Sequence, residues 1–442
     1  MPEAPYNRSW LFRDHQDVGL AVEAVKLARV FADMKFVQAA NPDSEWLRDW
    51  SRYVAYNART RHALDGILFA YAVTPGPDGE PHGFDEARRM AGQLEAFILA
   101  SPVLECQVFE HPTQGGGPGY IVALSAFASD LMATVSWALP TLYHAYQADE
   151  ETPTDLRSLE EFIRRYAPAR DAVRDLDQAL SSYLRVWESG DARLQAPISI
   201  LPTGDDGSQE SEAALAEGNA THAACQTFLL AHEFSHVTHD HFNTEAIRPD
   251  LPPQSFLAEL PDETRREVEA DCAAFTLTMN TLLLREGDEP RVPDFPALKK
   301  TRLLSSPSRF PGKRRRQEQA QKDVRTLISN VNRATEACLS FYAVTELISA
   351  VARHRGNEAQ ALRFGKVSER RDAVRGYVQW VREGLEETWG VSIWNPEEAR
   401  RWAYLDRYID HLSQTLVPML DQAPPSRAAS VPATFRRGTS PS

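Results

Sequence analysis

The sequence is poor in cysteine: 442 residues contain four, and no two of them form a Cys-x-x-Cys pair. They stand far apart, at Cys106, Cys225, Cys272 and Cys338. Cysteines spaced in this way argue against a disulfide framework and favour reduced, mostly buried thiols. Reduced thiols are typical of a cytoplasmic protein, and this is the location that we expect.

A long uninterrupted apolar run is also missing. Residues 1–17 contain no apolar segment of the kind that a secretory signal requires. The most apolar stretch, residues 119–146, is interrupted by Asp130 and Pro140. A buried helix is therefore expected there, and a membrane span is not.

Positive charge is in deficit, with 48 Lys and Arg against 62 Asp and Glu and a net charge of −14. This balance argues against nucleic acid as the main partner, because phosphate binding needs a basic surface. The run KRRR at residues 313–316 is a local exception, which we interpret as a solvated helix start. Hydrophobic residues make up 43% and charged residues 25%, which is typical of a soluble globular protein.

Apolar periodicity predicts a mostly helical chain with a few short strands, an α+β fold. The expected helices span residues 18–40, 46–64, 84–99, 127–146, 154–187, 219–242, 262–285, 313–355, 368–388 and 396–420. The expected strands span residues 66–73, 103–111, 120–124 and 197–202, and the second and third should form a hairpin. The Pro- and Ser-rich residues 422–442 are expected to be disordered.

Residues 231–242 read AHEFSHVTHDHF and place four histidines within ten residues. On a helix, His232 and His236 lie one turn apart and about 40° from each other, so both imidazoles can reach one metal ion. Glu233 lies about 80° away on the same helix. From there it can reach a metal-bound water as a general base.

The helix that carries this motif has an apolar stripe on two sides, so we expect it to be buried on two sides. Two buried histidines and a glutamate need partners, because burying them unpaired is costly. His239 shares their stripe but lies about 10 Å from His232 along the helix axis, too far to complete the same site. The third ligand should therefore come from another part of the chain.

The predicted helix at residues 262–285 supplies acidic candidates. Helical spacing places Glu267 and Asp271 on its buried face, one turn apart, and Glu269 on the solvent face. We assign Glu267 as the third metal ligand and expect Asp271 to accept the free ring N–H of a ligand histidine. Two histidines and a glutamate with one open position are typical of a catalytic zinc site.

Two less specific interpretations remain open. In the first, HEFSH is a solvated polar segment, and Glu267 and Asp271 bind Arg265 or Arg302. In the second, a metal is bound without catalysis, although a purely structural site has no use for Glu233.

The motifs His232-Glu-Phe-Ser-His236 and Glu267-Val-Glu-Ala-Asp271 resemble those of the gluzincin clan of zinc metallopeptidases. The segment HEFSHVTHDH is similar to the HtpX and CAAX-prenyl-protease group. Those relatives are membrane proteins, however, and the gap of 31 positions from His236 to Glu267 is short for them. The chain more closely resembles the soluble Lit-type phage-exclusion peptidases of bacteria, and ImmA/IrrE-type regulatory peptidases are a further similar group.

This resemblance implies a zincin-like core over residues 66–290, in which a small twisted sheet backs the two motif helices. A helical region at residues 1–65, a second one at 291–421 and the tail at 422–442 would flank the core. The resemblance further implies a substrate peptide bound as an extra strand on an edge strand, and we assign that pairing to Ile198, Ser199 and Ile200. The expected protein is a zinc-dependent endopeptidase that cleaves a cytoplasmic protein, with a role in phage defence.

A different class of function remains possible. The flanking helical regions could bind a regulatory protein partner, with the metal site structural or latent until that partner docks. The variant Glu233→Gln separates the two functions, because only a hydrolase depends on a general base.

Overall fold

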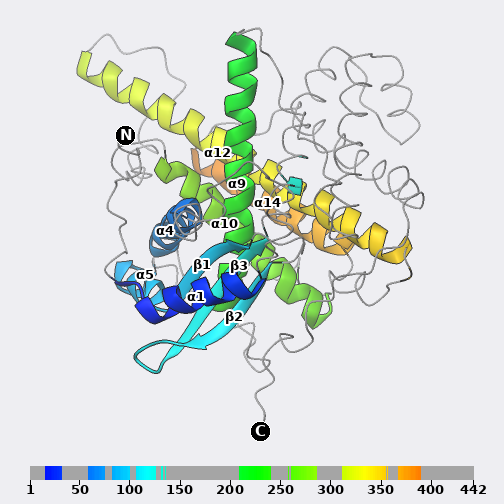
Figure 1. Cartoon of the computed structure of the whole chain (residues 1–442). Helices are drawn as coiled ribbons and strands as arrows, with labels where there is room; N and C mark the ends of the chain where they lie inside the picture. Colours follow the sequence, from blue (N-terminus) through cyan, green and yellow to red (C-terminus); the bar gives the residue numbers. More distant parts are fainter. Residues whose placement is uncertain are drawn as a thin grey trace.

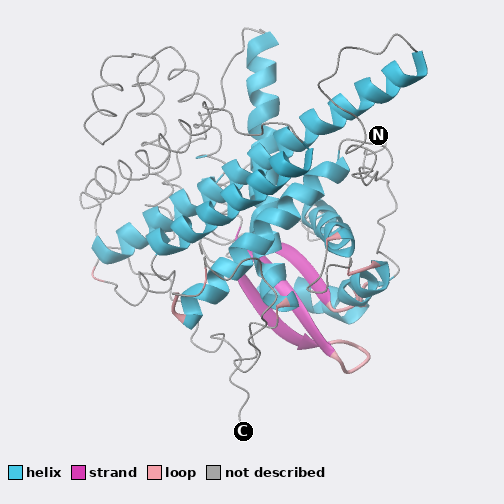
Figure 2. Cartoon of the chain, turned by 180° about the vertical axis from the view of Figure 1, so that it is seen from behind, coloured by secondary structure: helices cyan, strands magenta, loops and turns pink. Residues whose placement is uncertain are grey.

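The fold is known from a computed structural model of the chain, in which a defined set of residues is described. These are residues 15–31, 58–74, 82–99, 106–125, 131–132, 135, 209–239, 257, 260–285, 311–354, 356 and 367–389. Within them the protein is mostly helical and has one small sheet, which confirms the α+β, mainly α prediction (Figure 2).

Seven helices and three strands make up the described elements (Figure 1). The helices are α1 Val18–Phe31, α4 Ala58–Val73, α5 Phe84–Ala91, α9 Gln209–Thr238, α10 Asp262–Arg285, α12 Pro311–His354 and α14 Val367–Trp389. The strands are β1 Leu94–Leu99, β2 Gln107–Pro112 and β3 Pro118–Ser125.

The sheet is mixed, with the strand order β1-β3-β2. Strand β1 is parallel to β3, and β2 is antiparallel to it, as the predicted hairpin requires. Gly116, in the turn between β2 and β3, has a φ of 79°, a left-handed conformation that glycine adopts without steric cost. Alternate residues of β1 and β3 face the helical core, and α1 lies against the same two strands.

Two predictions about this region were wrong. The apolar run at residues 66–73, predicted as a strand, is the second half of helix α4. A short apolar run is compatible with a buried helix as well as a strand, and here α4 contacts α5, α9 and α10 along its length. Gly66 permits the close approach to α10, because a Cβ at this position would lie 2.9 Å from Cγ2 of Thr281.

The predicted helix at residues 84–99 is the second error. It is two elements: α5 ends at Ala91, Gly92 follows as its C-terminal cap, and β1 begins at Leu94. The backbone N–H of Gly92 bonds to the carbonyls of Arg88 and Arg89. The helix thus ends just before Gly92, and the apolar residues that follow join the sheet as β1.

The helices that carry the metal-site motifs lie at the centre of the fold. Helix α10 has the predicted bounds, α12 and α14 agree within two residues, and α9 starts ten residues earlier than predicted. One hydrophobic cluster joins buried side chains of α4, α5, β1, β3, α9, α10, α12 and α14. Boundaries at residues 65/66 and 290/291 stay a prediction, but α12 and α14 share this cluster with α9 and α10.

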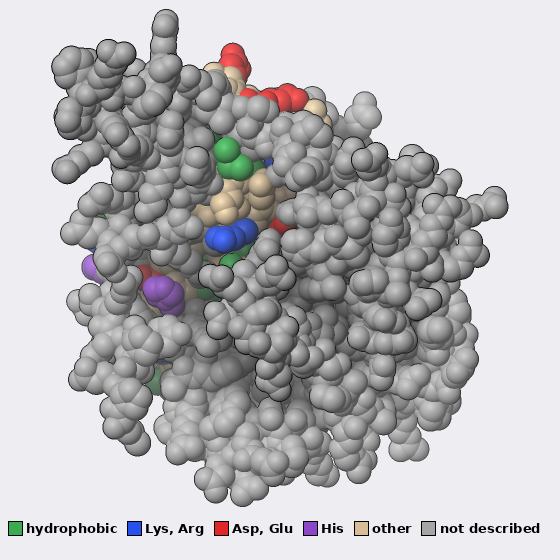
Figure 3. All heavy atoms as spheres, turned by 90° about the horizontal axis from the view of Figure 1, so that it is seen from above, with side chains coloured by type: hydrophobic (Ala, Val, Ile, Leu, Met, Phe, Trp, Pro, Cys, Tyr) green, Lys and Arg blue, Asp and Glu red, His purple; other side chains and the backbone are tan. Residues whose placement is uncertain are grey.

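Three of the four cysteines are buried and Cys106 is half-buried, and all four are free, as predicted. No described helix is both long and apolar enough to cross a membrane. On the face seen in Figure 3, acidic, basic and histidine side chains of described residues are all visible. The predicted elements at residues 154–187, 197–202, 396–420 and 422–442, and nearly all of 127–146, lie outside the described residues.

Candidate metal centre

The C-terminal half of α9 is buried on two sides, as its two apolar stripes predict. Phe228, Leu230 and Phe234 are buried in the main hydrophobic cluster, and α9 contacts both α10 and α12. His232 is buried and His236 is half-buried, and their Nε2 atoms lie 3.1 Å apart. The helical spacing of four residues therefore brings the Nε2 atoms of the two imidazoles together, with the rings nearly perpendicular.

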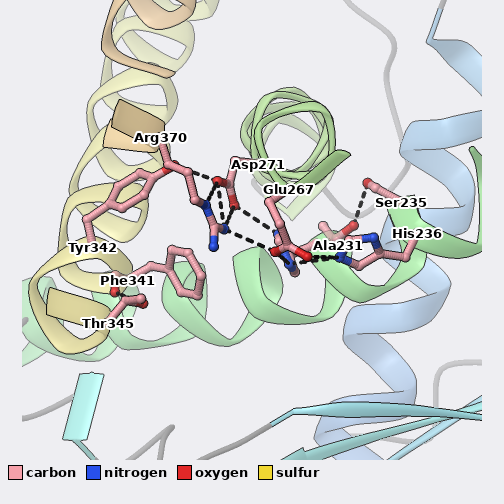
Figure 4. Close-up of polar contacts among 10 residues, drawn as sticks. Ala231, Ser235, His236, Glu267, Asp271, Phe341, Tyr342, Thr345 and Arg370 are labelled. Carbon is pink, nitrogen blue, oxygen red and sulfur yellow. Dashed lines mark hydrogen bonds and ion pairs between the residues drawn. The ribbon is translucent and has the colours of Figure 1, made fainter. Parts of the chain in front are cut away.

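Glu267 of α10 reaches the same point from the neighbouring helix (Figure 4). Its Oε2 lies 3.6 Å from Nε2 of His232, and its Oε1 lies 3.8 Å from Nε2 of His236. Ligand atoms at the corners of a tetrahedral zinc site are about 3.4 Å apart. The donors observed here need to move by only a few tenths of an ångström to bind one ion.

The donor set also fits a metal chemically. Two imidazoles and a carboxylate are ligands that zinc accepts, and three protein ligands leave a fourth position open. Among the described residues, His232, His236 and Glu267 form the group whose ligand atoms could hold a metal ion. His239, excluded on distance in the sequence, is not a member of that group.

Asp271 lies on the other side of His232. Its Oδ1 is 2.9 Å from Nδ1 of His232, although the ring N–H is not aimed squarely at that oxygen. The Asp271 carboxylate is fully buried, so this contact is shielded from water. A carboxylate on Nδ1 keeps the proton there and leaves the Nε2 lone pair directed at Glu267 and His236.

Two further side chains donate to Asp271. The hydroxyl of Tyr342, on α12, donates to Oδ2 at 2.5 Å. The guanidinium of Arg370, on α14, donates from Nε at 3.2 Å and from Nη2 at 2.9 Å to the same oxygen. Two helices therefore supply hydrogen-bond donors to this carboxylate of α10, and α9 places His232 against it (Figure 4).

Charge around this carboxylate overrides the effect of burial. Burial alone would raise the pKa of Asp271, but Arg370, His232 and Tyr342 together hold it below its ordinary value. Burial alone would lower the pKa of His232, and the contact with Asp271, helped by Glu267 and Glu233, raises it instead. Neighbouring charges thus outweigh burial for both Asp271 and His232.

Arg370 and Tyr342 were missed by the sequence analysis. Arg370 is 1% exposed, and its Nη2 also lies 3.3 Å from Oε2 of Glu267. The expected alternatives were Arg265, which pairs with Asp262, and Arg302, which lies outside the described residues. A signal was present: Arg370 falls three residues after Val367 and four before Val374, on the apolar stripe of α14.

Glu233 and the proposed substrate strand complete the predicted residues. Glu233 is half-buried on α9, and its charge acts on His232. Ile198, Ser199 and Ile200 lie outside the described residues. The structure thus brings together His232, His236, Glu267 and Asp271 and leaves the assignment of the substrate strand as a prediction.

No family model, no curated protein and no solved structure matches the chain. The resemblance to gluzincins therefore rests on the two short sequence motifs and stays an expectation. Any function must be argued from the chemistry of the centre.

Proposed function

We propose that the protein is a zinc-dependent endopeptidase, with His232, His236 and Glu267 as zinc ligands and Glu233 as general base. One observation carries the proposal. The Nε2 atoms of both histidines and the carboxylate of Glu267 converge at 3.1–3.8 Å, and Asp271 lies behind His232 at 2.9 Å. A chance polar cluster has no reason to include a buried carboxylate directed at the far nitrogen of a ligand histidine.

Each residue of the centre has a separate role in the proposed hydrolysis. A bound zinc ion supplies Lewis acidity, which polarises a carbonyl and lowers the pKa of water. Asp271 holds the proton on Nδ1 of His232 and so fixes the direction of its Nε2 lone pair. Glu233, next to His232 and half-buried, accepts a proton from the attacking water and passes it to the leaving amine.

Exposure of the ligands supports a catalytic site over a structural one. The side chain of His232 is 7% exposed, whereas that of Glu267 is 27% exposed. Solvent therefore reaches Glu267, whereas Asp271 and His232 are shielded from it. A structural zinc site usually has four protein ligands and no open position.

The order of elements supports a zincin-like core. A small mixed sheet, with β2 antiparallel at one edge, precedes the helix with the histidines, and the helix with the acidic ligand follows. We propose that a cytoplasmic protein substrate binds as an extra strand at residues 198–200. A cytoplasmic location and a role in phage defence, which the motif resemblance implies, belong to the same proposal.

The alternative is a regulatory helical protein whose metal site is structural or latent. It is favoured by the contribution of α12 and α14, which supply Tyr342 and Arg370 to the centre. A partner that moved either helix would disturb the surroundings of Asp271. The same connection would allow a partner to switch an endopeptidase on, so the two functions are compatible.

The variant Glu233→Gln tests the proposal. We expect it to keep one zinc per chain, measured by mass spectrometry, and to lose peptide hydrolysis by about 10²- to 10⁴-fold, because the base is lost and the ligands are not. Sequencing of protein N-termini in cells should show new cleavage products with the wild type and none with the variant. Glu269→Gln, two residues after Glu267 on α10, is the matched control and should behave as wild type.

Two results would contradict the proposal. Wild-type protein purified without chelator that contains no zinc would exclude the metal centre. A Glu233→Gln variant that keeps its zinc and its full cellular effect would exclude hydrolysis as the function and leave the partner-binding alternative.

A further inference from the structure

Arg370 touches both carboxylates that surround His232. Its Nη2 lies 2.9 Å from Oδ2 of Asp271 and 3.3 Å from Oε2 of Glu267. The ring of Phe341 lies against the guanidinium, with its centroid 5.8 Å from Cζ. At 1% exposure Arg370 has no access to solvent, so its charge is directed at these two acids and not at a substrate.

The two oxygens of Glu267 have different neighbours. Oε2 faces Arg370 at 3.3 Å and His232 at 3.6 Å, whereas Oε1 faces His236 at 3.8 Å. A guanidinium that engages Oε2 restricts rotation of the carboxylate and favours Oε1 as the atom presented to a metal ion. The planar fork of arginine can hold two carboxylates at fixed positions, and the single ammonium of lysine cannot do so equally well.

Arg370 also sets the charge of the centre. Asp271, Glu267 and Glu233 carry three negative charges, and the guanidinium reduces the total to two. A divalent cation balances the remainder, which matters because uncompensated charge is costly to bury. Without the arginine, the same ligands would surround a divalent ion with an excess negative charge.

From these contacts we infer that Arg370 is a positioning residue of the metal centre. It makes Glu267 a one-oxygen ligand, holds Asp271 against His232, and thereby makes zinc affinity depend on helix α14. The inference rests on the proposed zinc site and adds to it a residue outside both sequence motifs.

Two effects of removing Arg370 have opposite signs, which makes the inference testable. Loss of a positive charge near the ion would by itself strengthen zinc binding. Loss of the planar guanidinium would leave Glu267 and Asp271 free to move and would weaken zinc binding. Removing such supporting contacts from metal ligands typically lowers metal affinity by about 10- to 100-fold. Positioning is the larger effect if affinity falls.

The experiment measures zinc affinity of the full-length protein by competition with a chromophoric chelator, and the visible absorption spectrum after substitution with Co²⁺. Arg370→Met removes both the positive charge and the planar guanidinium, whereas Arg370→Lys keeps the positive charge and removes the guanidinium. We expect both variants to bind zinc about 10- to 100-fold more weakly and to show an altered Co²⁺ spectrum. The matched control is Arg371→Met, which makes the same change of charge one residue away, where the side chain faces Glu346 at 3.9 Å.

The control should bind within twofold of wild type with an unchanged spectrum. Wild-type or tighter zinc binding in Arg370→Met, with an unaltered spectrum, would overturn the inference while leaving the zinc site intact. If Arg370→Met does not fold, Arg370→Lys decides, because wild-type affinity in that variant is equally incompatible with positioning. Failure of the wild type itself to bind zinc would refute the proposed metal centre. This result is distinct from wild-type zinc affinity in Arg370→Met or Arg370→Lys, which would refute the role of Arg370 alone.

Discussion

We expect the hydrogen bond from Tyr342 to Asp271 to stabilise the fold measurably. It joins a buried hydroxyl to a fully buried carboxylate at 2.5 Å, and the pKa of Asp271 is held below its ordinary value, so the acceptor is ionised at neutral pH. Hydrogen bonds to charged groups contribute about 1.5–3 kcal/mol. Tyr342→Phe removes the hydroxyl and keeps the ring, so no large cavity forms.

The remaining contacts of Asp271 set an upper limit on the expected loss of stability. After the substitution, Asp271 still accepts from Arg370 at 2.9 Å and still lies 2.9 Å from His232. The cost should therefore stay below the roughly 3–5 kcal/mol of breaking a buried ion pair. We expect the free energy of unfolding to fall by about 1.5–3 kcal/mol.

A second tyrosine offers a matched comparison. The hydroxyl of Tyr377 is within hydrogen-bonding distance of the hydroxyl of Thr276, at 2.8 Å, and both groups are neutral. Tyr377→Phe should lower the free energy of unfolding by about 0.5–1.5 kcal/mol, because neutral hydrogen bonds contribute less. Both tyrosines are buried in helices, so the difference between the variants isolates the charge of the acceptor.

Urea unfolding of metal-free protein, followed by circular dichroism, measures both variants. Metal is left out because its binding would add to the apparent stability. If Tyr342→Phe costs no more than Tyr377→Phe, Asp271 is not the ionised centre of this network, and the account of His232 orientation is refuted.

Two further predictions concern other parts of the fold. Gly66→Val should lower the free energy of unfolding in urea by about 1–3 kcal/mol, because a Cβ at this position would lie 2.9 Å from buried Thr281. Gly384→Ala should raise it by about 0.5–1 kcal/mol, because a Cβ there would have nothing within 4 Å and alanine favours a helix. A change of the same sign in both variants would refute the packing argument. Burial raises the pKa of Glu95 above its ordinary 4.5 despite the contact with Arg61, so folding binds its proton more tightly and stability falls as pH rises above that value. Urea unfolding of wild type and Glu95→Gln at several pH values should show the variant gaining relative stability as pH rises, and a constant difference would contradict this.

Much of the helical fold could be predicted because periodicity was long and strong. Helix α10 extends over 24 residues and its ends were placed correctly, whereas the eight apolar residues at 66–73 were assigned to a strand. A run of eight is short enough for either structure, and the decision depends on neighbours that are distant in sequence. Capping by Gly92 was equally local but was overlooked because apolar spacing continued across it.

The candidate centre also contains residues that could be predicted from the sequence and residues that could not. His232, His236, Glu267 and Asp271 could be found because each pair is one helical turn apart, and such spacing is visible in sequence. Tyr342 and Arg370 lie 71 and 99 residues from Asp271, and their contact with it depends on how α12 and α14 pack. A charged residue on the apolar stripe of α14 indicates a buried charge, but it does not indicate which acidic side chain pairs with it.

The distance of Arg370 from the two motifs has a consequence during translation. When a ribosome has completed α10, the nascent chain holds both histidines and both acids but lacks the two helices that orient them. Another 99 residues separate Asp271 from Arg370, about 5–20 s of synthesis at ordinary rates. A newly made chain therefore cannot assemble the oriented group of side chains around His232 until most of it has left the ribosome.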